Sequence, residues 1–172
     1  GARMKPNHKL TTVSSLRLAA PGMGVALALL FLGGTGCNKF SVTTPEGFVS
    51  LKKWRTTHRY KAVSPDNAVI SVRTFKHRDK GTLAFWTEIL KREMTLRKGY
   101  KLQDSKEVRT GNGAPGQRMV FSAQSGKTSY TYAVAVFVTR KWIHVLETAG
   151  RSPIYAKHTA AFDAALRSFR PD

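Results

Sequence analysis

Side chains that could carry out chemistry are few and widely spaced in this 172-residue chain. Metal binding needs His, Cys and carboxylate ligands at short spacings, and catalysis by Ser or Cys needs a base beside the nucleophile; neither pattern occurs. Gly111–Gly116 lacks the Gly-Lys-Ser/Thr ending of a phosphate-binding loop and is typical of a hairpin loop. We therefore expect no enzyme, no metal and no cofactor; a pocket gathering His58, His77 and a carboxylate would reverse this. The five histidines are His8, His58, His77, His144 and His158.

The only cysteine, Cys37, follows a short apolar run from Val25 to Leu32 and then four small residues. A membrane-spanning helix needs about 20 apolar residues, whereas a signal peptide needs only about 7–15 after a positively charged start. This order resembles a bacterial lipoprotein signal peptide ending in a lipobox, which implies lipid attachment at Cys37. The upstream basic residues are Arg3, Lys5, Lys9 and Arg17.

Lipidation would also account for the unpaired thiol, because one cysteine cannot form an intrachain disulfide. Two or more acyl chains hold a protein at a membrane stably where one is marginal. The alternative is a plain secretory signal cut by an ordinary signal peptidase, since Gly34 stands where lipoboxes usually carry Leu. Asn38, rather than the Asp that resembles an inner-membrane retention signal in enteric bacteria, favours the outer membrane.

The expected domain organisation follows from Cys37. Residues 1–36 are the signal peptide, with 1–3 an upstream remnant before Met4, and residues 37–46 are a polar tether. Residues 47–172 form one domain, long enough for a single core but not for two. The domain is expected outside the cytosol, facing the periplasm or the cell exterior from the cell membrane or the outer membrane.

The charge of the chain is strongly positive, with 29 Lys and Arg against 10 Asp and Glu. Without the four basic residues before Cys37, the remainder carries a net +15. Such a surface attracts anionic partners. Behind an export signal these are anionic lipid, lipopolysaccharide or cell-wall polymer, and nucleic acid is unlikely. The alternative is a charge that serves solubility and retention without a specific ligand.

One basic cluster stands close to the expected tether and includes a tryptophan. We expect its cations to contact anionic headgroups, with Trp54 at the interface; the alternative is a solvated face with Trp54 over the edge of the core. Its residues are Lys52, Lys53, Trp54, Arg55 and Arg59. Two further basic groups are Arg73, Lys76, His77, Arg78 and Lys80, and Lys91, Arg92, Arg97 and Lys98.

Strand signals recur along the chain. In Ser129–Thr139 both alternating faces are apolar, which predicts a central strand covered on both sides. Ser64–Asn67 has turn chemistry, because Pro presets φ and Asp and Asn bond their own backbone. The expected strands are Phe48–Leu51, Arg59–Val63, Val69–Phe75, Lys106–Thr110, Gln117–Ala123, Ser129–Thr139 and Trp142–Thr148.

Two amphipathic helices are expected. Leu83–Lys98 has Thr82 as N-cap, Gly99 as stop and ion pairs from Glu88 to Arg92 and from Glu93 to Arg97. Its apolar stripe comprises Leu83, Trp86, Leu90, Met94 and Arg97, flanked by Phe85 and Ile89. The second helix begins with Ser152 as N-cap and Pro153 in the first turn, and continues to Phe169.

This order predicts an α+β fold: an antiparallel sheet of about six strands with helices packed on both faces. From Pro45 to Phe169 the chain resembles the PsbP/DcrB-like superfamily. The carrying segments are Pro45–Phe48, Pro65-Asp66, Lys98–Tyr100, the strand pair Tyr132–Thr139 and Trp142–Thr148, and Leu166–Phe169. The resemblance implies an accessory or assembly role at membranes and no shared catalytic site.

Two functions are compatible with these observations. The first is an exported, lipid-anchored, non-enzymatic accessory protein that binds an envelope protein or another envelope component. The alternative is a cationic domain that binds polyanions such as anionic lipid, lipopolysaccharide or nucleic acid. Salt separates the two, because binding by phosphate neutralisation weakens steeply with log[salt].

Overall fold

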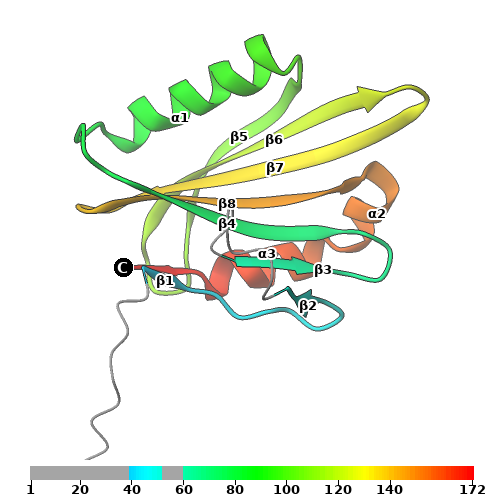
Figure 1. The fold of residues 1–172 in the computed structure, drawn as a ribbon, viewed down its shortest axis with the longest axis horizontal. Helices are drawn as coiled ribbons and strands as arrows, with labels where there is room; N and C mark the ends of the chain where they lie inside the picture. The colour runs from blue at the N-terminus through cyan, green and yellow to red at the C-terminus, as the bar shows by residue number, and fades with distance from the viewer. Residues whose placement is uncertain (1–38, 52–59) are drawn as a thin grey trace, which may run out of the picture. The chain divides into compact units, whose positions relative to one another are not determined.

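The computed structural model describes residues 39–51 and 60–172. Their main element is a seven-stranded antiparallel sheet in the order β2-β3-β4-β8-β7-β6-β5 (Figure 1). The α+β class is therefore confirmed, with one strand more than the approximate six expected. The strands are β2 (Val49–Ser50), β3 (Tyr60–Val63), β4 (Val69–Lys76), β5 (Lys101–Arg109), β6 (Pro115–Ser125), β7 (Thr128–Val138) and β8 (Trp142–Arg151).

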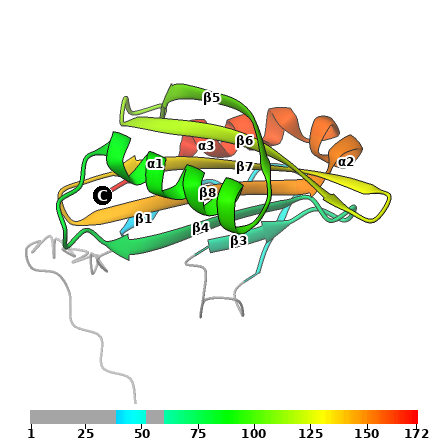
Figure 2. The ribbon, with the colours of Figure 1, turned by 90° about the horizontal axis from the view of Figure 1, so that it is seen from above.

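Helices cover the sheet on both faces. One face carries α1 (Leu83–Arg92), which continues as one π-helical turn, η2 (Glu93–Arg97). The other face carries α2 (Ser152–Lys157) and α3 (Thr159–Ser168). Figure 2, which looks down on α1, places it in front of the strands, with α2 and α3 behind them.

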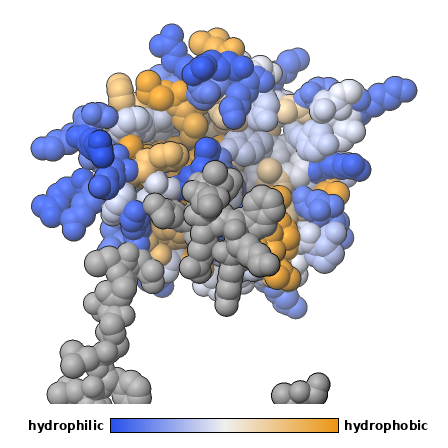
Figure 3. All heavy atoms as spheres, in the orientation of Figure 1, coloured by the Kyte–Doolittle hydropathy of each residue, from blue (hydrophilic) through white to orange (hydrophobic). Residues whose placement is uncertain are grey.

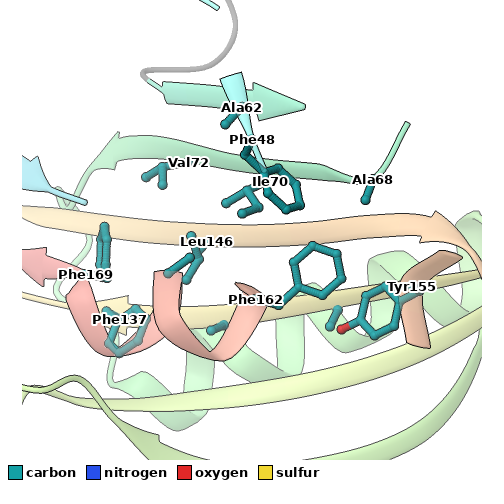
Figure 4. Close-up of a cluster of buried hydrophobic side chains, with 13 residues drawn as sticks. Phe48, Ala62, Ala68, Ile70, Val72, Phe137, Leu146, Tyr155, Phe162 and Phe169 are labelled. Atoms are coloured by element: carbon teal, nitrogen blue, oxygen red, sulfur yellow. The ribbon is translucent and has the colours of Figure 1, made fainter. Parts of the chain in front are cut away.

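The central strand β7 divides the interior into two cores, as its alternation predicts. Val134 and Val136 point towards α1 and pack with Ile143 and Val145 of β8. The neighbouring residues Ala133, Ala135 and Phe137 point towards α3. There, Phe162 and Phe169 lie against Ile70, Val72 and Leu146 of the sheet (Figure 4).

The hairpin between β3 and β4 closes through the expected turn. The Ala68 amide donates to the Ser64 hydroxyl oxygen at 2.9 Å, and the Asn67 amide donates to the Ser64 carbonyl at 3.0 Å. Asn67 has φ +67°, a left-handed conformation that asparagine tolerates better than most residues. The turn places Asp66 beside the junction between α2 and α3, where it contacts Lys157 and His158.

The first helix begins as predicted and ends in an irregular turn. The Phe85 amide donates to the Thr82 hydroxyl oxygen at 3.2 Å, and Gly99 ends the helix with φ +69°. Arg97 pairs with Glu93 at 3.1 Å as expected. The other predicted pair is wrong, because Glu88 binds Lys91 at 2.5 Å instead of Arg92.

The last helix differs from the prediction at its start and in its middle. Arg151 is the N-cap in place of Ser152, whose hydroxyl oxygen accepts a hydrogen bond from Thr131 at 3.1 Å. The helix is also broken at His158, with φ −100° and ψ +12°. This break allows the His158 ring to lie 2.8 Å from the Asp66 carboxylate.

The segment expected to be a tether packs on the domain where the structure describes it. β1 (Phe40–Ser41) pairs antiparallel with β9 (Arg170–Pro171), and Phe40 and Val42 contact the α3-side core. The Thr43 amide donates to the Ser168 hydroxyl oxygen at 3.1 Å. Residues 39–43 are therefore held against the sheet and its last helix.

Candidate interaction surface

The structure brings a serine, an aspartate and a histidine together, but not in a catalytic arrangement. The Ser64 hydroxyl donates to Asp66 Oδ1 at 2.6 Å, and His158 Nε2 lies 2.8 Å from that same oxygen. In a nucleophilic triad the histidine must instead contact the serine hydroxyl. The Ser64 hydrogen bond, with those of His158 and Lys157, holds the pKa of the Asp66 carboxyl well below its usual range. The cluster joins the β3–β4 turn to the α2–α3 break.

Two other histidines, His77 and His144, also make contacts that serve the fold. His77 has both ring nitrogens beside backbone carbonyl oxygens, those of Thr139 at 2.8 Å and Gly81 at 3.0 Å. His144 is fully buried, with Nδ1 3.3 Å from the Thr74 hydroxyl, and burial lowers its pKa to about 4. In residues 39–51 and 60–172 no three His, Cys, Asp or Glu side chains gather as metal ligands would.

The helix α1 covers only part of its face of the sheet. Leu83, Trp86 and Leu90 pack on the α1-side core, and Met94 of η2 is buried there. The helix contacts β6 and β7, towards one edge of the sheet. β4 lies on the other side of β8, so no helix of residues 39–51 and 60–172 covers the face of β4 beside α1.

An open groove of about 400 Å³ occupies this uncovered region. Its floor is formed by Val136, Ile143 and Val145, from β7 and β8. Phe75 of β4 and Ile89 of α1 line its sides, and these side chains are 47% and 48% exposed. The groove therefore presents apolar surface from two elements that are separated by the whole β4–α1 connection.

A buried polar cluster adjoins the floor of the groove on β4 and β8. Glu147 accepts hydrogen bonds from Arg73 Nε at 2.9 Å and Nη2 at 2.5 Å, and from Ser71 at 3.3 Å. The Tyr132 hydroxyl also donates to this carboxylate. Burial and the negative charge of Glu147 raise the pKa of the Tyr132 hydroxyl. Because Arg73 faces Val145 across the β4–β8 ladder, the cluster fixes the two strands that carry the groove.

A second depression, of about 530 Å³, lies on the other side of α1 against β5 and β6. Its lining mixes charged and apolar side chains, including Glu88, Glu107 and Arg109. It offers no continuous apolar floor, so we take the β4–α1 groove as the candidate binding site.

Only some of the candidate residues from the sequence lie in the described part of the chain. Cys37 and the cluster Lys52, Lys53, Trp54, Arg55 and Arg59 lie outside the described residues, as does His58. Of the second basic group, Arg73 is committed to Glu147 and His77 to two carbonyls, whereas Lys76, Arg78 and Lys80 are exposed.

Sequence reasoning missed the groove and the Glu147 cluster. The sequence places Phe75 in an expected strand and Ile89 in an expected helix. Their apolar side chains were the one available signal that these positions could form a binding surface. Glu147 lies near the end of an otherwise apolar expected strand, where a single acid indicates a buried partner. Nothing in the sequence pairs it with Arg73, 74 residues earlier.

Solved structures share this fold. Cyanobacterial PsbP (CyanoP) from Synechocystis is 13% identical, with 78% of this chain and 87% of that one covered and a TM-score of 0.59. LpqN from Mycobacterium tuberculosis, described as involved in cell envelope biogenesis, is 13% identical, with 76% and 81% covered and a TM-score of 0.62. The fold is therefore PsbP-like. No protein-family model matches the chain, and no curated protein matches it by sequence.

Within the part of the chain that the structure describes, no helix is both long and apolar enough to cross a bilayer.

Proposed function

We propose that this protein is an exported, lipid-anchored, non-enzymatic accessory protein of the bacterial cell envelope. The Val25–Cys37 pattern supports the export and the anchor, because it has the length, the basic start and the small residues of a lipoprotein signal. LpqN, which has the same fold and is described as involved in cell envelope biogenesis, supports the compartment. The Ser64–Asp66–His158 geometry supports a role without catalysis.

The observation that carries the binding role is the groove between α1 and β4. It is open to solvent, and a small ligand in such a groove would keep much of its surface in water, whereas ligand sites usually bury most of the ligand. An apolar stripe on a helix or extended segment of a partner protein would cover Phe75 and Ile89 together. The occupant we propose is therefore an apolar segment of an envelope protein.

The anchor is tested by the intact mass of the protein isolated from its own membranes. We expect a chain that begins at Cys37 and carries two or three acyl groups. The substitution Cys37→Ser should leave the signal uncut and the chain without acyl groups, so the variant should have the mass of the unmodified precursor and a lower electrophoretic mobility than the wild type. A native chain that begins at another residue, or a serine variant with the mass and mobility of the wild type, would contradict the anchor.

The groove is tested by an exposed apolar residue within it and a matched one elsewhere. Ile89→Lys places a charge in the groove, while Leu102→Lys places one on the edge strand β5, where Leu102 is also exposed. After cross-linking in intact cells, the partner found with the wild type should be lost from the Ile89 variant alone. Equal capture by both variants would refute the groove as the site.

Polyanion binding remains the second candidate, and the net charge of +15 from Cys37 onwards favours it. It predicts an affinity for a model polyanion such as heparin that falls steeply with salt, roughly as the number of neutralised phosphates or sulfates. Complex formation through the groove should change little between 50 and 200 mM salt. Measuring both complexes across about that range separates the two functions.

A further inference from the structure

The described chain begins at one end of the domain, close to the proposed anchor. Lys39 precedes β1, its carbonyl accepts from the Asp172 amide at 3.1 Å, and its ammonium lies 3.8 Å from the Trp142 ring centroid. Cys37 is two residues before Lys39, and two residues span at most about 7 Å. Little free chain therefore separates a lipid on Cys37 from the folded domain.

Two loops meet at this end of the domain. The β7–β8 turn at Arg140-Lys141 precedes Trp142, and Trp142 faces Lys76 of β4 in the sheet. His77 fastens the β4–α1 connection to this turn, through its amide to the Lys141 carbonyl at 2.9 Å and its ring to Thr139. In Figures 1 and 2 the start of β1, the C-terminus, the β7–β8 turn and the start of α1 lie on the same side of the domain.

Exposed cations gather on these segments. We call them the basic end: Lys76, Arg78, Lys80, Arg140, Lys141 and Arg170. None of the six forms an ion pair with another described residue. Asp79 and Asp172 are the acidic side chains on the same segments. In Figure 3 long hydrophilic side chains project from the side at which these segments lie in Figure 1.

We propose that the basic end is a docking surface for the anionic phospholipid headgroups of the membrane that holds the anchor. This inference rests on the proposed lipid anchor. The reach of about 7 Å is comparable to the Debye length of about 8 Å at physiological salt, so a lipid on Cys37 would bring Lys39 within the field of the membrane surface. Lys39 contacts Trp142, which follows the β7–β8 turn, so the domain can turn its basic end towards that surface. Basic residues so close to an anionic leaflet add to binding individually.

Docking at this end fixes the orientation of the domain. The β6–β7 turn, which contains Lys127, and the end of α1 near Lys98 lie away from the basic end (Figure 1). These regions then face away from the bilayer. The groove beside α1 is lined by Lys76 as well, so a partner in the groove would meet the domain near the membrane surface.

The test is lysine acetylation of the full protein, purified with its native amino terminus and mixed with vesicles. Vesicles of phosphatidylethanolamine and phosphatidylglycerol are compared with vesicles of phosphatidylcholine. On anionic vesicles we expect Lys76, Lys80 and Lys141 to react about fivefold more slowly, with unchanged rates in phosphatidylcholine. The exposed lysines at the opposite end of the sheet or at the far end of the first helix should react equally in both; these are Lys98, Lys101 and Lys127.

A pair of double variants provides the matched control. Arg78→Gln with Arg140→Gln removes two cations of the basic end and should weaken the protection of Lys80 and Lys141 severalfold. Arg92→Gln with Arg151→Gln removes the same charge elsewhere and should leave protection unchanged. All four arginines are exposed, so the fold does not depend on their guanidinium groups.

Each remaining outcome decides the inference. Protection that is uniform over the surface, or equal in both vesicles, overturns it. Protection by soluble polyphosphate as strong as that by vesicles also overturns it, since the surface would then bind polyanions in general. The intact mass of the same preparation reports the anchor separately: an acylated protein without selective protection refutes only the docking surface. If Cys37 is not acylated, selective protection of the added protein still supports the surface, and its absence refutes it.

Discussion

Replacing Arg73 with methionine tests how far the groove strands depend on the buried ion pair. The Glu147 side chain is 7% exposed and that of Arg73 is 34% exposed. Arg73→Met removes both guanidinium hydrogen bonds from the carboxylate but leaves the donors Ser71 and Tyr132. The remaining negative charge would be buried without the Arg73 guanidinium.

The expected loss can be bounded from the geometry. Breaking a buried pair from one side costs about 3–5 kcal/mol, because the other charge stays buried. Arg73 is one-third exposed, so water can enter where the guanidinium was, and we expect about 3 kcal/mol. Against a total stability of about 5–15 kcal/mol this is a large fraction. Removing both charges, in Arg73→Met with Glu147→Met, should recover part of the loss, because the adjoining floor is already apolar, although the Ser71 and Tyr132 hydroxyls lose their acceptor.

Urea unfolding, followed by far-ultraviolet circular dichroism, measures both effects as shifts in the midpoint at constant slope. Arg92→Met is the control, since Arg92 is exposed and forms no ion pair with any described residue. A single Arg73 variant that loses less than about 1 kcal/mol would refute the reasoning. So would a double variant as unstable as the single one.

Three further predictions concern stability measured in the same way. Burial lowers the pKa of His144 to about 4, so the folded state binds fewer protons than the unfolded chain between that pH and 6.5; stability should fall as the pH falls through this window, and His144→Leu should flatten the decline. The raised pKa of Tyr132 predicts the opposite slope: stability should fall above about pH 10, where only the unfolded chain loses the proton, and Tyr132→Phe should reduce that fall. Gly116→Ala should cost about 2–3 kcal/mol, because the new Cβ would lie 2.5 Å from the Phe137 ring, whereas in Gly150→Ala the nearest atom to the new Cβ is the Tyr155 nitrogen at 3.5 Å and the substitution should cost less. Unchanged pH slopes in the two variants, or equal losses at the two glycines, would contradict these expectations.

Local patterns predicted the sheet well because the pleat itself sets their period. Along β7, Val134 and Val136 alternate with Ala133 and Ala135, and the two sets face different cores as predicted. The Thr82 cap and the Gly99 stop also follow from neighbouring backbone groups. Such features depend on residues a few positions apart, which a sequence displays directly.

Features set by distant segments were not predictable in this way. The apolar period of the last helix continues through His158, yet the helix breaks there, and Asp66, which binds the ring, is 92 residues earlier. The groove depends on where α1 rests relative to β4, and no pattern within α1 specifies that position. The segment from Lys39 to Thr43 is a similar case, because Phe40 in β1 pairs with β9, which is more than 120 residues later in the chain.

The pairing of β1 with β9 has a consequence for the order of assembly. Phe40 faces Pro171, so β1 cannot pair with β9 until β9 has been synthesised. The entropic cost of closing a loop rises only slowly with loop length. The β1–β9 pairing is therefore late mainly because β9 is synthesised last. The segment from Lys39 to Thr43 would thus complete its packing last during biogenesis, and a chain cut before Arg170 should keep its sheet and lose the β1–β9 pairing, while Phe40 can still contact Phe169.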